Sequence, residues 1–287
     1  MPPNRGTDKK EEQNKRMMKW KQSLANSIGK AINASIIPRG EVALLLEKEH
    51  LERFLTDFQI DCVFDVGANE GQYAEKLREI GFRGLIISFE PIPALASVLR
   101  QKANHDPYWF IEELALDETV RDTAFNIMAD SQFSSLKTPN HAETDLFTEM
   151  NVVAQSIQLT TARLEEVFDR YKARLQFSRP FLKMDTQGND LAVARGACDR
   201  LRRFVGLQSE LAIKKVYEHQ ADYREAIEFY IAAGFELSAF VPNNLGHFPR
   251  LIEIDCIMYN PKLIYLENIP PRAEVELDLR SHPTRRS

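Results

Sequence analysis

The sequence predicts an α/β fold: a doubly wound, mostly parallel sheet of seven strands with an N-terminal helical extension. Two observations predict this class. Short apolar runs alternate with helical patterns along most of the chain, which is the order of elements in a parallel sheet covered by helices. The first run, residues 63–66, also passes through two closely spaced glycines directly into a helix, as strands do where a ligand meets the sheet.

The first half of the chain is predicted to contain three helices and four strands. The helices cover residues 42–58, 72–80 and 93–102, and the strands cover residues 63–66, 84–89, 108–116 and 125–129. The segment 125–129 is an added strand or one arm of a hairpin. Pro91 keeps Glu90 out of the α region, so we expect the chain to leave the second strand extended.

The second half continues the alternation after a long irregular section. Residues 130–155 show no clear periodicity, which is typical of a lid or a binding loop. The helices are predicted over residues 161–171, 189–197 and 223–233, and the strands over residues 181–184, 205–210, 235–241 and 252–259. Gly234 ends the last helix.

Composition and charge divide the chain into four parts: a polar tail (1–16), a helical extension (17–60), the main domain (61–262) and a C-terminal tail (263–287). Residues 1–40 carry nine basic and three acidic residues, a local charge of +6. Because the net charge of the whole chain is −5, the remaining residues carry a charge of −11. Apolar residues recur at helical spacing from Met17 to Ala31. This basic helix either docks on the main domain or, through residues 17–37, contacts an anionic membrane surface.

Composition also excludes several classes of protein. The net charge of −5 argues against broad nucleic-acid binding. No apolar run reaches the ~18 residues that span a bilayer, and no signal-peptide pattern is present. The three cysteines, Cys62, Cys198 and Cys256, are widely spaced, which argues against a zinc site or a disulfide framework. We therefore expect a cytoplasmic protein, with the inner membrane surface as the alternative location.

The segment Gly67-Ala68-Asn69-Glu70-Gly71 is the most informative stretch of the sequence. Glycine there brings backbone N–H groups and a helix N-terminus close to a ligand, because a Cβ would hold the ligand away. Asn69 stands where dinucleotide-binding turns have their second glycine, so the turn disfavours NAD. Asp65, at the strand tip, suits a ligand with a positive pole, such as the amino end of a methionine moiety. Both observations favour S-adenosylmethionine.

Glu90 is the second candidate binding residue. It follows the second strand, about 20 residues beyond the glycine turn, where nucleotide-binding βαβ units place a carboxylate for the ribose. A carboxylate can accept hydrogen bonds from both hydroxyls of a cis diol.

Two more carboxylates and an amide form the candidate reaction centre. Asp185 ends one predicted strand, Glu210 ends the next, and Gln187 lies between them in sequence. If the two strands are adjacent, the carboxylates meet at the same edge of the sheet. They could then remove a proton from a hydroxyl, or Asp185 and Glu210 could bind a divalent cation such as Mg²⁺. The sequence leaves both open.

Several segments, in this order, resemble the FkbM-type methyltransferases. They are Phe-Asp-Val-Gly-Ala-Asn-Glu-Gly at 64–71, Phe-Glu-Pro at 89–91, Phe-Leu-Lys-Met-Asp-Thr-Gln-Gly-Asn-Asp at 181–190, Gln-Ser-Glu-Leu at 208–211 followed by Val-Tyr at 216–217, and Ala-Gly-Phe at 233–235. The resemblance covers roughly residues 60–260. The basic N-terminal 60 residues lie outside it.

The resemblance implies a Rossmann-like class I methyltransferase that uses S-adenosylmethionine. It assigns Gly67, Asn69 and Gly71 to the first cofactor motif and Glu90 to the ribose. The segment Ala115-Leu116-Asp117 falls where the adenine pocket forms. Many members have Glu at the position of Gln187. The sequence Asp-Thr-Gln-Gly at 185–188 is similar to that of one subgroup, so we do not assign to Gln187 the role that a glutamate has in other members.

Members of this family mostly methylate hydroxyl oxygens of glycans or polyketide-type natural products. We therefore expect O-methylation of a glycan or small-molecule acceptor, without a nucleic-acid partner. A hydroxyl has a high pKa and needs a base in the transition state. Asp185 is the first candidate and Glu210 the second, with a histidine as the alternative: His141, His219 or His247.

Two other functions stay open at this point. One is a nicotinamide-dependent oxidoreductase on the same architecture, which Asn69 disfavours. The other is a non-catalytic methyltransferase-like module that the N-terminal helix recruits to a membrane or a partner. The sequence does not indicate the acceptor or the oligomeric state.

Overall fold

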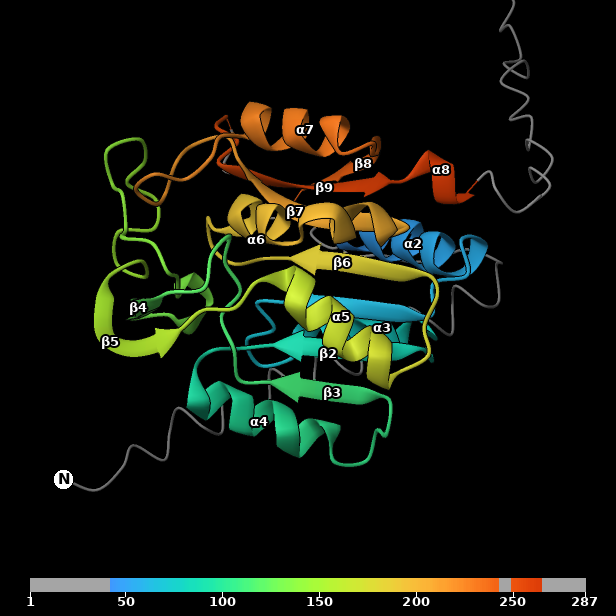
Figure 1. Ribbon diagram of the computed structural model, residues 1–287. Helices are drawn as coiled ribbons and strands as arrows, with labels where there is room; N and C mark the ends of the chain where they lie inside the picture. Colours follow the sequence, from blue (N-terminus) through green and yellow to red (C-terminus); the bar gives the residue numbers. More distant parts are fainter. Residues whose placement is uncertain (1–41, 243–248, 265–287) are drawn as a thin grey trace, which may run out of the picture. The chain divides into compact units, whose positions relative to one another are not determined.

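The computed structural model describes residues 42–242 and 249–264 (Figure 1). The chain divides into two units, residues 1–51 and 52–287. Helix α2 (Val42–Asp57) begins in the first unit, and every other described element lies in the second. The predicted helix within residues 17–37, His247 and most of the C-terminal tail lie outside the described residues.

The second unit is built on a seven-stranded sheet, as predicted. Its order is β3-β2-β1-β6-β7-β9-β8, and all neighbours are parallel except those that involve β9. The strands are β1 (Cys62–Val66), β2 (Leu85–Phe89), β3 (Trp109–Glu112), β6 (Pro180–Met184), β7 (Gly206–Ala212), β8 (Glu236–Val241) and β9 (Glu253–Tyr259). Strand β3 is shorter than predicted, because the chain turns away after Glu112.

Helices cover both faces of this sheet. They are α3 (Gln72–Glu79), α4 (Pro93–Ala103), α5 (Leu164–Arg174), α6 (Asp190–Gly196), α7 (Tyr223–Ala232) and α8 (Pro261–Ile264), with 3-10 turns at η2 (Ser131–Phe133) and η3 (Cys198–Arg203). Side chains of α5, α6, α7 and η3 enter the main core on one face. On the other face, Tyr73 of α3 meets Lys183 and Gln208. No helix among the described residues is long and apolar enough to cross a membrane.

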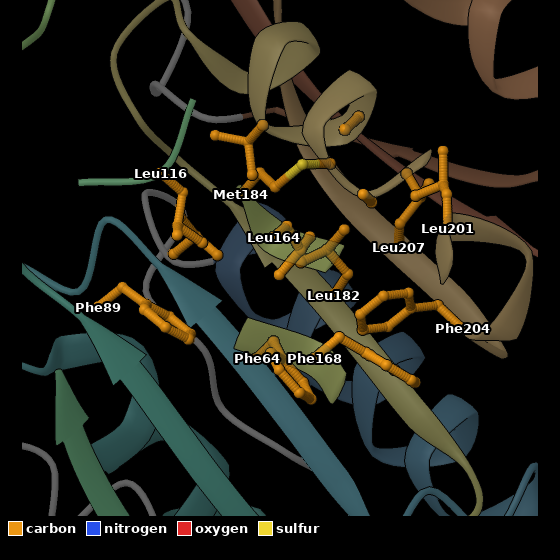
Figure 2. Packing of buried hydrophobic residues seen from close by; sticks show 14 of the residues in the cluster. Phe64, Phe89, Leu116, Leu164, Phe168, Leu182, Met184, Leu201, Phe204 and Leu207 are labelled. Atoms are coloured by element: carbon orange, nitrogen blue, oxygen red, sulfur yellow. The ribbon is translucent and has the colours of Figure 1, made fainter. Parts of the chain in front are cut away.

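The main core gathers around the ring of Phe64 in the central strand β1. Four phenylalanine rings surround it at centroid distances of 5.4 to 6.2 Å: Phe89, Phe168, Phe177 and Phe204. Figure 2 labels Phe64 and three of these rings, Phe89, Phe168 and Phe204. Phe64 is fully buried, and removing such a ring typically costs about 3–5 kcal/mol. This packing explains why the β1 sequence reads as a buried apolar run and why its end is held firmly.

A separate hairpin interrupts the alternation after β3. Strand β4 (Asp122–Met128) pairs antiparallel with β5 (Val153–Thr160). The hairpin lies toward the carboxyl ends of the parallel strands (Figure 1). The prediction of an irregular segment up to residue 155 was therefore wrong at its end, and β5 was missed altogether. Most of β5 is exposed, so it lacks the apolar alternation that marks a half-buried strand. Helix α5 accordingly begins at Leu164, later than predicted.

The strand register fixes which residues meet at the carboxyl edge of the sheet. Val66 pairs with Phe89 on one side and with Met184 on the other, and Met184 pairs with Ser209. The residues that follow these four therefore form a row: Glu90, Gly67, Asp185 and Glu210. The centre of this row is the boundary between β1 and β6, where the strand order reverses. Sheets of this class bind their ligands at this point.

Candidate active site

The glycine turn has the backbone that its sequence predicts. Gly67, Asn69 and Gly71 have φ angles of 80°, 47° and 90°, all in the left-handed region. Backbone N–H groups of Gly67 and Ala68 donate to the carbonyl oxygen of Phe89. Helix α3 starts immediately after Gly71, so the turn presents a helix N-terminus at the carboxyl edge of the sheet.

The two glycines are required for a reason that the sequence did not reveal. A Cβ on Gly67 would lie 1.9 Å from the carbonyl oxygen of Asp185, and a Cβ on Gly71 would lie 2.8 Å from Leu99 and 3.0 Å from Trp109. The space beside each glycine is therefore filled by the protein itself. The expectation that a Cβ would mainly hold off a ligand is corrected: these glycines let β1 approach β6 and let the turn pack on α4 and β3.

Glu90 is held by two backbone donors. The N–H of Asn69 donates to Oε2 and the N–H of Ile92 donates to Oε1, each at 2.9 Å. Burial raises the pKa of Glu90 to about 7, although both hydrogen bonds oppose the rise. A carboxylate has about four acceptor sites, so each oxygen keeps one for a further donor. Glu90 thus connects the glycine turn to the end of β2 and can still accept from a diol.

Asp65 is paired within the chain. It is fully buried in β1, accepts from the hydroxyl of Ser88 at 3.0 Å, and lies 3.2 Å from Nζ of Lys183. The indole N–H of Trp109 donates to the same serine hydroxyl. The positive pole that the sequence suggested for Asp65 is therefore already supplied by a lysine of the protein.

Lys183 was not singled out by sequence reasoning. It stands in the middle of the buried strand β6, whose other residues are Pro180, Phe181, Leu182 and Met184, and it is 6 % exposed. Burial would lower the pKa of its ammonium, but the charges of Asp65 and Asp185 outweigh burial and raise it. The available signal was the lysine itself, because a charge inside an apolar parallel strand is rarely buried without a partner.

Asp185, Gln187 and Glu210 come together as predicted. Strands β6 and β7 are neighbours, and Nε2 of Gln187 donates to Asp185 Oδ1 at 2.9 Å and lies 3.3 Å from Glu210 Oε2. The Asp185 side chain is 42 % exposed, so a substrate can reach it. Glu210 lies inside β7, two residues before the end, and not at its tip.

A buried tyrosine fixes the orientation of the Gln187 amide. The hydroxyl of Tyr217 lies 3.0 Å from Gln187 Oε1 and 2.7 Å from the carbonyl oxygen of Phe133, and both atoms are acceptors for its single proton. The backbone of Gln187 is left-handed (φ 53°), and its carbonyl oxygen accepts from Ser135 Oγ at 2.7 Å. The amide nitrogen therefore faces the two acids.

The acids beyond Asp185 are in a more buried setting. Burial raises the pKa of Glu210 well above its ordinary value, and the charges of Glu253 and Asp185 add to the rise. Glu253, on β9, is 5 % exposed, and its Oε1 has no hydrogen-bond partner; burial raises its pKa to about 8. Asp190 anchors this region, since its Oδ2 accepts from Ser209 Oγ and from the backbone of Glu210.

A strap formed by residues 131–151 crosses beside this row. Ser131 Oγ lies 3.4 Å from Oδ1 of Asn69, and the backbone N–H of Asn140 and the side chain of Asn151 both donate to the carbonyl oxygen of Val216. The strap is therefore tied both to the glycine turn and to the segment after β7. Its role as a lid or binding loop stays a prediction.

The remaining predicted residues are placed as follows. Ala115 and Leu116 are buried, and Leu116 joins the main core. The carboxylate of Asp117 pairs with Arg121. His141 and His219 are exposed, and no hydrogen bond joins either side chain to the acids of the described site.

Among the described residues, no group of three or more His, Cys, Asp or Glu side chains could hold a metal ion.

Comparisons with solved structures find distant likenesses. Fibrillarin from Aeropyrum pernix, solved with natively bound S-adenosyl-L-methionine, is 15 % identical over 75 % of this chain and 74 % of its own, with a TM-score of 0.41. Magnesium protoporphyrin IX methyltransferase from Synechocystis, with the same ligand, is 10 % identical over 79 % and 86 %, with a TM-score of 0.41. A methyltransferase from Listeria monocytogenes is 10 % identical over 75 % and 97 %, with a TM-score of 0.42. These values assign no function to this chain.

A search among curated proteins gives no match. The family model of the methyltransferase FkbM domain matches residues 65–237. This range contains the glycine turn, Glu90, Asp185, Gln187 and Glu210, and it covers more than half of the chain. The match confirms the resemblance drawn from the sequence motifs: the chain belongs to the FkbM methyltransferase family.

Proposed function

We propose that this protein transfers the methyl group of S-adenosylmethionine to a hydroxyl oxygen of a glycan or a natural product. The observation that carries the proposal is the position of Asp185. It is the neighbour of Gly67 across the sheet edge, it is half exposed, and it receives a hydrogen bond from Gln187. A carboxylate that a substrate can reach thus lies beside the turn that meets the cofactor in this fold.

The residues at the edge of the sheet fit the cofactor. Glu90 keeps acceptor capacity for the ribose hydroxyls, and the turn from Gly67 to Gly71 places the N-terminus of α3 at the same edge of the sheet. Ala115 and Leu116 supply apolar surface near the end of β3. When bound, S-adenosylmethionine supplies a methyl group already activated by the sulfonium. The protein then has to align the acceptor and take its proton.

Asp185 is the better of the two candidate bases. Burial and neighbouring acids raise the pKa of Glu210 well above its ordinary value, which favours the protonated form of its carboxyl group. A protonated carboxyl group cannot accept the proton of the acceptor hydroxyl. In the proposed step, the acceptor oxygen bonds to the methyl carbon as the bond from that carbon to sulfur breaks, and the hydroxyl proton passes to Asp185.

Gln187 connects the two candidate acids. Its amide nitrogen donates to Asp185 and faces Glu210, and Tyr217 holds the amide oxygen on the opposite side. Gln187 is a neutral group that orients the Asp185 carboxylate by a hydrogen bond. A glutamate at position 187 would instead add another negative charge beside Asp185.

Calorimetry of the full chain with S-adenosylmethionine and with S-adenosylhomocysteine tests the cofactor. We expect both to bind, and we expect NAD(P)H to give no heat and no thermal shift. Transfer of labelled methyl groups to a panel of hydroxylated acceptors, analysed for the oxygen methylated, then tests the reaction. A larger shift with NAD(P)H would favour a nicotinamide oxidoreductase, and methylation at nitrogen or carbon would contradict the proposed acceptor class.

A further inference from the structure

The ammonium group of Lys183 is surrounded by three oxygen atoms from different parts of the site. Nζ donates to the carbonyl oxygen of Gly67 at 3.1 Å, and it lies 3.2 Å from Asp65 Oδ1 and 3.6 Å from Asp185 Oδ2. The ring of Tyr73 covers it, with Nζ 5.2 Å from the ring centroid. The contact with the carbonyl oxygen of Gly67 is a hydrogen bond, whereas the two carboxylates act on the ammonium as ion pairs.

These contacts join the glycine turn to the candidate base. Asp65 alone would suffice to neutralise a buried lysine, yet the ammonium also reaches the turn and Asp185. The two oxygens of Asp185 then have different partners: Oδ2 lies 3.6 Å from the ammonium of Lys183, and Oδ1 accepts a hydrogen bond from Gln187. The Asp185 side chain is 42 % exposed, and without these two contacts a short exposed side chain would turn freely.

We propose that Lys183 is a positioning residue that fixes the carboxylate of Asp185 beside the glycine turn, in addition to neutralising Asp65. This inference rests on the proposed function, in which Asp185 faces the methyl group. It assigns a task to a buried residue that does not itself touch the acceptor.

The alternative is that Lys183 serves the fold alone, as the partner of Asp65. A single change of Lys183 cannot separate the two roles, because it leaves Asp65 as an unpaired buried charge, which typically costs 3–5 kcal/mol. The double variant Asp65→Asn/Lys183→Met removes both charges at once and keeps both shapes. Its net charge equals that of the wild type. If Lys183 serves only Asp65, this variant keeps a normal site.

Sinefungin is a suitable probe because it needs no acceptor. In this analogue, a carbon that bears an ammonium group replaces the sulfur and its methyl group, while S-adenosylhomocysteine has an uncharged sulfur there. The ratio of the two dissociation constants therefore measures how well a carboxylate is directed at the position of the methyl group. We expect wild type to prefer sinefungin and Asp185→Asn to lose that preference.

The proposal predicts that Asp65→Asn/Lys183→Met folds, binds S-adenosylhomocysteine within about twofold of wild type, and loses roughly fivefold of the preference for sinefungin, the scale of a partly exposed ion pair. Adding Asp185→Asn to the double variant should remove only the preference that remains, so that the two losses are less than additive, since both act on the same group. The charge-balanced control is Arg78→Met/Asp106→Asn, which removes another ion pair, of 2.7 Å, and should leave the ratio unchanged.

Four outcomes would overturn the proposal. An unchanged ratio in the folded double variant would assign Lys183 to Asp65 alone. An equal loss in the Arg78/Asp106 control would show that the ratio reports general destabilisation. A wild-type chain that binds neither compound would contradict the proposed function and this inference with it, whereas a wild type that binds both without any preference would contradict only the directing role of Asp185.

Discussion

At the scale of single residues, the carboxylates of the site differ in their partners and in their exposure. Asp65 is neutralised by a lysine, Glu90 is held by two backbone donors, and Asp185 is left accessible between Lys183 and Gln187. Glu253 has no such compensation at Oε1. One sheet edge thus offers one exposed, directed acid among several that are buried.

The buried Glu253 should make stability depend on pH. Its pKa is raised from 4.5 to about 8 in the folded state. The folded protein therefore binds more protons than the unfolded chain between these values, and the unfolding free energy falls as pH rises from about 4.5 to 8. We predict that Glu253→Gln stabilises the protein above pH 8, by on the order of 1–3 kcal/mol, and flattens this decline.

Urea denaturation at pH 5, 7 and 9 measures this effect. Glu228→Gln, an exposed change on α7, serves as the control and should follow the wild-type curve. If Glu253→Gln were less stable than wild type at pH 9, the glutamate would have to be charged and well compensated in the native protein.

At the scale of elements, the exits of β1 and β6 are packed against each other. The carbonyl oxygen of Asp185 occupies the position where Gly67 would carry a Cβ. The glycine turn and the candidate base are therefore packed together, and Lys183 contacts both. Changes in the turn should affect folding before they affect binding.

Comparison of two glycines can separate crowding from backbone strain. Gly67 and Gly81 have similar φ angles, 80° and 92°, but a Cβ at Gly81 would meet nothing within 4 Å. We predict that Gly81→Ala costs about 1–2 kcal/mol, which is the strain alone, and that Gly67→Ala costs more than about 3 kcal/mol, because the strands must also separate. Chemical denaturation of both variants measures the difference. Equal losses would mean that the exits of β1 and β6 are not tightly packed.

The sequence predicted those elements whose burial is uniform. The runs that became β1, β2, β6 and β7 are buried on both faces, so their apolar character was visible without any knowledge of their neighbours. Strand β5 escaped because its side chains are mostly exposed. The sequence analysis could only assume that β6 and β7 are adjacent. Strand order is set by tertiary packing, and the local sequence pattern does not show it.

The same division applies to the candidate site. Asp185, Gln187 and Glu210 were predictable because they follow or end apolar runs, and sheets of this kind gather such positions at one edge. Lys183 and Tyr217 were not, because their roles come from partners distant in sequence: Asp65 is 118 positions before Lys183, and Gln187 is 30 positions before Tyr217.

At the scale of the whole molecule, charge is divided unevenly. Residues 1–40 carry +6 and the remainder carries −11. We predict that the full chain co-sediments with vesicles containing phosphatidylserine at low salt, because basic residues near an anionic surface contribute about 1 kcal/mol each, and that a chain lacking residues 1–40 does not. Neutral phosphatidylcholine vesicles are the control. If the shortened chain stays off vesicles but also loses thermal stability, the segment docks on the main domain.

The central claim is that Asp185 takes the proton of the acceptor hydroxyl during methyl transfer. The most direct measurement compares labelled methyl transfer by wild type, Asp185→Asn and the exposed control Asp199→Asn, each with its dissociation constant for S-adenosylmethionine from calorimetry. The account predicts that Asp185→Asn lowers turnover by about 10²–10⁴-fold, the usual contribution of a general base, with cofactor binding retained, and that Asp199→Asn matches wild type. Near-normal turnover by Asp185→Asn would contradict it.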